Sequence, residues 1–247
     1  MPRQARKKSE SGIYHIMLRG INQQVIFECD EDKEKFLQTL NHYRAISEYK
    51  IFAYCLMSNH IHVLLKVEKE NLDLILKRIA GSYVYWYNWK YRRNGHLFQD
   101  RFKSEPVDDD SYFFTVLRYI HQNPIKGGIC KNAKDYKYSS YNEYLSEPFL
   151  TDTDFCYSII DKEQFINFHN ELNYDNCLDI EENNFRLTDE EAKRIIQKIS
   201  NCKTITDFQN LDIKKRDKYL KNFREKGLSI RQLSRLTGIS FNIVRKF

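Results

Sequence analysis

The sequence contains no run of apolar residues long enough to span a membrane, and no hydrophobic signal core follows its basic first eight residues. Its six cysteines include no C-x-x-C pair. These absences argue against a membrane protein, a disulfide-stapled secreted domain and a cysteine-ligated zinc site. We therefore expect a cytoplasmic protein with reduced thiols and no membrane partner.

The chain of 247 residues is 41% hydrophobic and 14% aromatic, which suffices for one large or two small packed domains. Its net charge of +6 is unevenly spread: +6 over residues 1–145, −11 over 146–191 and +11 over 192–247. A basic body and a basic tail joined by an acidic connector suggest two modules that both meet a polyanion. Solvated helix faces are the alternative. We place the domains at 1–145, 146–187 and 188–247.

Residue periodicity predicts the elements of the first domain. Strands are expected at 14–19, 50–57, 60–67 and 102–107, and helices at 30–48 and 71–91. A further helix should start at Asp109 or Asp110 and stop near Gln122, before Asn123 and Pro124. The order β-α-β-β-α-β predicts an α+β fold with a ferredoxin-like antiparallel sheet. Two helices should cover one face, and the final helix can cover the other.

The C-terminal third is predicted to be all-α. A short helix is expected at 165–172, a linker at 175–184, a helix opened by the capping box at 188–191 and another at 214–226. Residues 230–247 place Ser234, Gly238 and Val244 at helix-turn-helix spacing, with about two turns left for a recognition helix. A plain helical hairpin remains an alternative.

Two histidines one residue apart, His60 and His62, lie on the third predicted strand and should share one face, opposite Ile61. Two imidazoles on a rigid strand can hold a metal ion and leave its far side open for catalysis. On the final helix, Tyr119 and Asn123 are spaced to share a face. If that face meets the histidines, Asn123 can add an oxygen ligand and Tyr119 can aim its phenol at a phosphate.

Three motifs in order resemble the HUH single-tyrosine transposases, and in particular the REP-associated tyrosine transposases: SNHIHVLL at 58–65, GHLFQDRFKS at 95–104 and RYIHQNP at 118–124. The first strand also fits this family, so the resemblance covers roughly residues 10–145. It implies a metal-dependent enzyme that cuts single-stranded DNA through a 5′-phosphotyrosine link. By the resemblance Tyr119 is the nucleophile and His60, His62 and Asn123 are metal ligands, although many relatives have Gln at the last place.

The resemblance also sets the expected partners. We expect hairpin-bearing single strands as substrate, duplex DNA through the C-terminal domain, and either a monomer or a homodimer. The metal should be Mg²⁺ or Mn²⁺ by availability, although two imidazoles also suit softer ions. A rolling-circle initiator or relaxase-like nickase, and a non-catalytic DNA-binding regulator on the same fold, are the alternatives.

Basic and aromatic residues beside each other suit a surface that grips a nucleic-acid strand. His15, His42 and His169 have no partner in the sequence pattern and are interpreted as structural, whereas His96 and His121 lie in motifs without an assignable role. The predicted DNA-binding residues are Arg92, Arg93, Phe98, Arg101 and Lys103 in the first domain, and Arg231, Arg235, Asn242 and Arg245 in the tail.

Overall fold

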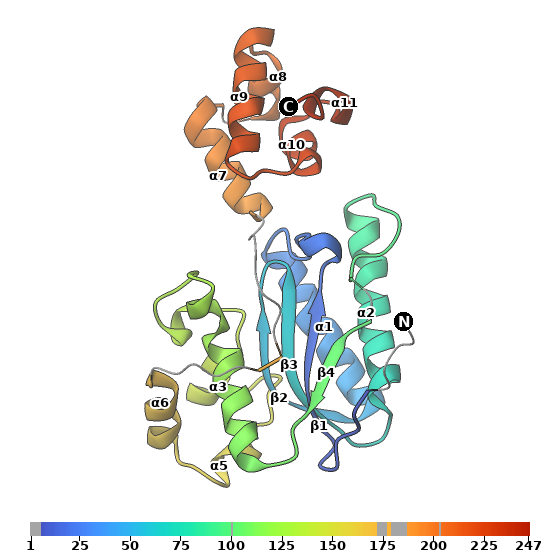
Figure 1. Ribbon diagram of the computed structural model, residues 1–247, viewed down its shortest axis with the longest axis vertical. Coiled ribbons are helices and arrows are strands. Elements are labelled where there is room, and N and C mark those ends of the chain that lie inside the picture. Colours follow the sequence, from blue (N-terminus) through green and yellow to red (C-terminus); the bar gives the residue numbers. More distant parts are fainter. Residues whose placement is uncertain (1–5, 100, 172–176, 179–186, 203) are drawn as a thin grey trace.

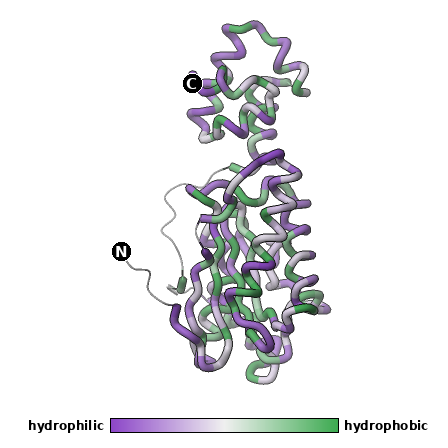
Figure 2. Tube along the Cα trace, turned by 90° about the vertical axis from the view of Figure 1, so that its right-hand side faces the viewer, coloured by the Kyte–Doolittle hydropathy of each residue, from purple (hydrophilic) through white to green (hydrophobic). Residues whose placement is uncertain are grey.

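The computed structural model describes residues 6–99, 101–171, 177–178, 187–202 and 204–247. Its buried apolar side chains form two clusters, one drawn from residues 13–177 and the other from residues 192–244. The second, all-helical unit is stacked on one end of the first (Figures 1 and 2). None of the helices in the described ranges combines the length and the apolar character needed to cross a membrane. The predicted domain boundaries stay predictions.

The first unit is built on a four-stranded antiparallel sheet. Its strands are β1 (Ile13–Arg19), β2 (Tyr49–Leu56), β3 (His60–Val67) and β4 (Lys103–Pro106), in the spatial order β2-β3-β1-β4. The predicted β-α-β-β-α-β order is confirmed. Strands β1 and β3 are central, which explains why they are buried on both faces, whereas β4 is a short edge strand.

Helices α1 (Asp30–Ser47) and α2 (Leu72–Lys90) contact each other. The α1 N-terminus is capped by a reciprocal pair, because the buried Asp32 carboxylate accepts the backbone N–H groups of Glu28 and Cys29. The same carboxylate binds the Lys90 ammonium at 2.6 Å and the Tyr91 hydroxyl. The start of α1 is thereby tied to the end of α2.

Helix α3 (Asp110–Lys126) packs over β2 and β3. Its predicted N-cap is confirmed, because the Asp109 carboxylate accepts the N–H of Tyr112 at 2.7 Å. Its predicted end is wrong: the helix runs through Pro124 and stops at Gly127. Proline costs most in a helix interior, and here it stands in the last turn. Ile120, Asn123 and Pro124 are all buried, so packing fixes the helical path.

Residues 128–170 fold back onto the first core. They contain η2 (Ala133–Asp135), α4 (Tyr141–Leu145), α5 (Asp154–Tyr157) and α6 (Lys162–Asn170), with Tyr144 and Phe165 stacked at 4.6 Å between ring centroids. The short helix predicted at 165–172 exists but begins and ends earlier. Most of the linker predicted at 175–184 lies outside the described residues.

The second unit contains α7 (Asp189–Ser200), α8 (Ile205–Gln209), α9 (Ile213–Glu225), α10 (Ile230–Thr237) and α11 (Phe241–Val244). The capping box of Thr188 with Glu191 is confirmed. Between α10 and α11 Gly238 has φ 67°, and a Cβ there would lie 2.3 Å from the Gln209 side chain, so both backbone and space require glycine. Helix α11 has one turn, where about two were expected.

Candidate active site

The predicted site residues of β3 and α3 come together on one face of the sheet. His60 and His62 are 4% and 0% exposed, and both turn toward α3. The His62 ring lies edge-on to Tyr119, with 5.6 Å between centroids. His60 Nε2 and Asn123 Oδ1 are 3.3 Å apart. Ile61, buried on the opposite face, anchors the strand in the core, so the strand alternation places the histidines as predicted.

His62 is held by a neighbour on β1. His62 Nδ1 is 2.9 Å from His15 Nε2, and His15 Nδ1 is 2.8 Å from Glu105 Oε1 on β4. His62 Nε2 is buried and has no hydrogen-bond partner among the described residues. His15, which the sequence led us to interpret as structural, thus contacts the site. Its partners are 47 and 90 residues away in the sequence, and only their common sheet face could have indicated them.

His60 is oriented by its preceding residue. The Asn59 side-chain oxygen accepts a hydrogen bond from His60 Nδ1 at 2.7 Å, which leaves Nε2 with its lone pair. That lone pair faces the Asn123 amide oxygen. An imidazole nitrogen and an amide oxygen this close together are donor atoms that one cation could share. His60, His62 and Asn123 are thus the side chains that could hold a metal.

Tyr119 is 2% exposed and lies beside His15 as well, with 5.9 Å between ring centroids. The Lys126 ammonium is 4.4 Å from the centre of the Tyr119 ring and adds positive charge to this region. Tyr112, the nearest other candidate nucleophile, is hydrogen-bonded to Glu105. Burial, followed by the Glu105 charge, raises the pKa of Tyr112 well above 10. Tyr112 is therefore a partner of Glu105, which contacts the site through His15.

Burial within this face disfavours a charge on His62. Burial, followed by the neighbouring His60 and His15, lowers the pKa of His62 well below 6.5. Burial of Glu105 by itself raises its pKa, but hydrogen bonds from His15, the N–H of Leu178 and Tyr112 lower it below 4.5 overall. At pH 7 His62 is consequently an uncharged imidazole and Glu105 a carboxylate.

His121, whose role the sequence left open, belongs to a separate buried network. Its Nδ1 is 2.9 Å from His169 Nε2 and its Nε2 is 2.8 Å from Ser140 Oγ. His169 Nδ1 donates to the Phe165 carbonyl oxygen at 2.8 Å. Every ring nitrogen of this pair is used. His121 therefore fastens α6 and the start of α4 to α3.

Comparisons with known proteins identify the family of this chain. Residues 8–123 match the family model of the IS200-like transposases. A protein of Haemophilus influenzae assigned to the REP-associated tyrosine transposases is 30% identical over 126 residues, which span 46% of this chain and 68% of the relative. The chain belongs to the REP-associated tyrosine transposases.

A solved structure of a REP-associated tyrosine transposase, bound to a REP hairpin, shares the fold of this transposase. The TM-score is 0.52 at 15% identity, over 60% of this chain and 87% of that chain. The family model ends at residue 123, so residues 188–247 lie beyond the matched region.

The predicted DNA-binding residues of the transposase differ in their exposure to solvent. Arg92, Arg101 and Lys103 are exposed, as are Asn242 and Arg245 in the tail. Phe98, by contrast, is 8% exposed, and its ring lies 6.4 Å from that of Tyr83. Its aromatic face is therefore used in the core and is not offered to a base.

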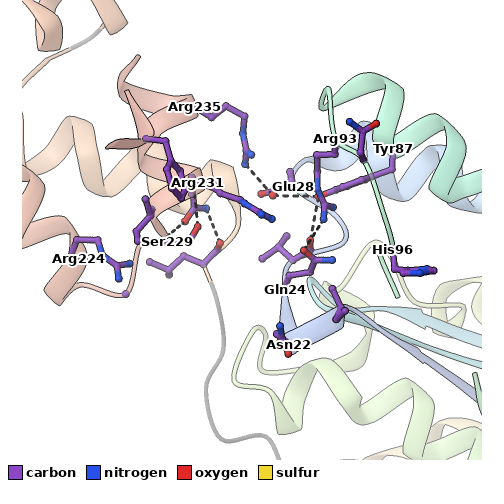
Figure 3. Close-up of a pocket in the computed structure, with 18 residues that line it drawn as sticks. Asn22, Gln24, Glu28, Tyr87, Arg93, His96, Arg224, Ser229, Arg231 and Arg235 are labelled. Carbon is purple, nitrogen blue, oxygen red and sulfur yellow. Dashed lines mark hydrogen bonds and ion pairs between the residues drawn. The ribbon is translucent and has the colours of Figure 1, made fainter. Parts of the chain in front are cut away.

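The remaining three predicted residues, Arg93, Arg231 and Arg235, line one cavity of about 660 Å³ between the two units (Figure 3). His96 lines the same cavity. The Arg235 guanidinium lies 3.0 Å from Glu28 of the first unit and 2.6 Å from Asp189 of α7. Burial raises the pKa of Glu28 to about 8, so Asp189 is the carboxylate that mainly balances the Arg235 charge at pH 7.

Proposed function

We propose that this transposase is a metal-dependent DNA strand transferase that cuts single-stranded DNA with Tyr119. His60, His62 and Asn123 would hold Mg²⁺ or Mn²⁺ beside the scissile phosphate. Two observations carry the proposal: these four side chains lie together on one face of the sheet, and a buried imidazole nitrogen among them, His62 Nε2, lacks a hydrogen-bond partner among the described residues.

The donor atoms fit a divalent cation. Within the described ranges no three His, Cys, Asp or Glu side chains form a metal-binding group, so the ion would take two imidazole nitrogens and one amide oxygen. This small set leaves coordination positions open for water and phosphate oxygens, as catalytic ions require. When bound, the ion supplies charge neutralisation at the phosphate.

The chain's own residues then account for the reaction. The Tyr119 oxygen attacks phosphorus and gives up its proton, the bond to the 3′ oxygen breaks, and that oxygen leaves and takes up a proton as a 3′-hydroxyl. A second 3′-hydroxyl later attacks the same phosphorus, and the Tyr119 oxygen leaves. One phosphodiester replaces another, so no nucleotide cofactor is consumed. The burial of Tyr119 restricts its rotamers and aligns the phenol, which is otherwise a weak nucleophile with a pKa of about 10.

Hairpin-bearing single strands are the proposed substrate, because the fold is shared with a transposase bound to a REP hairpin. For α10 and α11 we propose a helix-turn-helix that adds duplex binding, supported by the tight turn at Gly238 and the exposed Arg231 and Arg245. The single turn of α11 limits base reading, so phosphate contacts should dominate. A homodimer remains a further proposal.

The test is covalent capture. A labelled hairpin with a single-stranded flank is incubated with the protein and Mg²⁺ or Mn²⁺ and resolved under denaturing conditions. The wild-type protein and the Tyr112→Phe control should form a protein–DNA adduct, and Tyr119→Phe should not. An undiminished adduct in Tyr119→Phe would assign the nucleophile elsewhere. No adduct in the wild type, with DNA binding intact, would favour the non-catalytic regulator.

A further inference from the structure

Three side chains form a row across three neighbouring strands beneath the candidate active site. Glu105 on β4 is the direct cross-strand partner of His15 on β1. His15 in turn faces Leu64 on β3, two residues from His62 on the same face. The side-chain distances are 2.8 Å from Glu105 to His15 and 2.9 Å from His15 to His62. The row ends at His62 Nε2.

Hydrogen-bond chemistry assigns the protons along this row. An ionised carboxylate only accepts hydrogen bonds, so His15 Nδ1 must carry the proton that faces Glu105. When His15 carries this one proton only, its Nε2 is bare and can only accept, so the proton facing it belongs to His62 Nδ1. His62, neutral in its turn, is left with a lone pair on Nε2. One carboxylate at the sheet edge thus fixes the tautomers of two histidines.

We propose that His15 and Glu105 are positioning residues that hold His62 in the tautomer whose bare Nε2 faces Tyr119 and the metal. The proposal rests on the proposed function for the identity of the metal, but the tautomer itself is a property of this chain alone. Neither residue is among the proposed metal ligands. They act by orienting His62 and by making its Nε2 a better donor, as carboxylate partners do for metal-binding histidines.

The geometry separates this role from simple core packing. A buried acceptor without a partner loses its hydrogen bonds to water and gains none, so an ordinary core histidine is expected to have both nitrogens bonded. His121 and His169 meet that expectation, whereas His62 does not. Glu105 is in addition held in place by the N–H of Leu178 at 3.0 Å and by Tyr112, which fixes the carboxylate that starts the row.

The first measurement is the ring-nitrogen NMR spectrum of the metal-free, full-length protein labelled with ¹⁵N. In the wild type we expect His62 protonated at Nδ1 and bare at Nε2. Glu105→Gln, which preserves shape, should shift His62 toward a mixture of tautomers, and His15→Phe should favour protonation at Nε2. His15→Gln restores an acceptor oxygen and should rescue the wild-type tautomer. His169→Gln, which alters only the other histidine pair, is the matched control and should change nothing at His62.

The second measurement is Mn²⁺ affinity of the same proteins without DNA. Glu105→Gln and His15→Phe should weaken binding roughly 10- to 100-fold, with His15→Gln between them and the wild type. A wild-type His62 protonated at Nε2, an unchanged tautomer in Glu105→Gln, or unchanged Mn²⁺ affinity despite a changed tautomer would each overturn the proposal. If the wild type binds no Mn²⁺, the metal step of the proposed function fails, and the tautomer measurement still decides whether His15 and Glu105 hold His62.

Discussion

The first unit contains two hydrogen-bonded histidine pairs, both buried and both with 2.9 Å between ring nitrogens. They differ in how each pair ends. His121 and His169 end on Ser140 and on the Phe165 carbonyl, so both rings are saturated. The pair of His15 and His62 ends on a carboxylate at one side and on a bare nitrogen at the other.

This difference teaches how a structural histidine is told from a functional one in this fold. Burial and a histidine neighbour are common to both pairs, and burial is the main cause that lowers the pKa of His62, His121 and His169. Neither burial nor pKa therefore distinguishes them. What distinguishes them is the unsatisfied acceptor, because the cost of burying it is retained only where something else offsets it.

The difference in role between the two histidine pairs is tested most directly by truncating one histidine of each pair. His62→Ala should lower DNA cleavage at least about 100-fold, since losing a direct ligand exceeds the loss of an outer partner. His121→Ala should instead lower the free energy of unfolding by roughly 2–4 kcal/mol, through a cavity and unpaired neighbours, while the folded protein still cleaves. Adduct yield and urea unfolding are measured on both variants. Equal effects on cleavage would show that the two pairs do not differ in role.

Lowering the pH should reduce the free energy of unfolding through the pair of His121 and His169, whose ring nitrogens are all hydrogen-bonded. Burial lowers the pKa of His169 to about 4 from 6.5. Between these two values the unfolded chain binds a proton that the folded chain does not, so stability present above pH 6.5 is lost as pH falls through 4. The loss is on the order of 3 kcal/mol. Urea unfolding at pH 7 and pH 4.5 should show most of it, and His169→Gln should reduce the difference. An equal pH difference in that variant would assign the acid sensitivity to other groups.

A smaller effect is expected at the third proposed ligand. Asn123→Ala should lower cleavage about 10-fold, because water can replace one oxygen ligand of a hard cation. The variant for comparison is His60→Ala, which removes the imidazole that Asn123 faces and should lower the cleavage rate more than Asn123→Ala does. Initial rates of adduct formation at saturating Mg²⁺ give both values. A greater loss in Asn123→Ala than in His60→Ala would make the proposed ligand set wrong.

The smallest effects on chemistry should come from the tail, which touches neither pair. Arg231→Ala and Arg245→Ala should each weaken duplex DNA binding and reduce the slope of log affinity against log salt by about 1. Arg216→Ala is the control, since Arg216 is paired with Asp217. Cleavage of a saturating hairpin should stay unchanged in all three. If the Arg231 and Arg245 variants kept the wild-type salt slope, the proposal that the tail binds DNA would be wrong.

Much of the fold was accessible from the sequence because its signals are local. Strand alternation set the face of His60 and His62, and helical spacing set that of Tyr119 and Asn123, both independently of distant contacts. Pro124 misled the prediction because a local rule about proline was overridden by packing in the last turn of α3.

What the sequence did not reveal depends on pairing between distant segments. Glu105 reaches His15 only because β4 adds to β1, and the register of that pairing is not a local property. Phe98 illustrates the same limit, since an aromatic residue beside basic ones can either stack on a base or fill a core. Arg93 and Arg235 line the same cavity only because the two units lie against each other.

The pairing of β4 with β1 also decides where this protein tolerates insertion. Side chains alternate faces along a strand, so one residue added inside β4 would turn Glu105 away from His15 and bring a neighbour such as Ser104 to its place. The same residue added at Gly95, an exposed position with open space around it, would leave the strand register untouched. The register of this four-residue edge strand thus aligns the site, and its length can vary little, whereas the loop before it can take an insertion at Gly95.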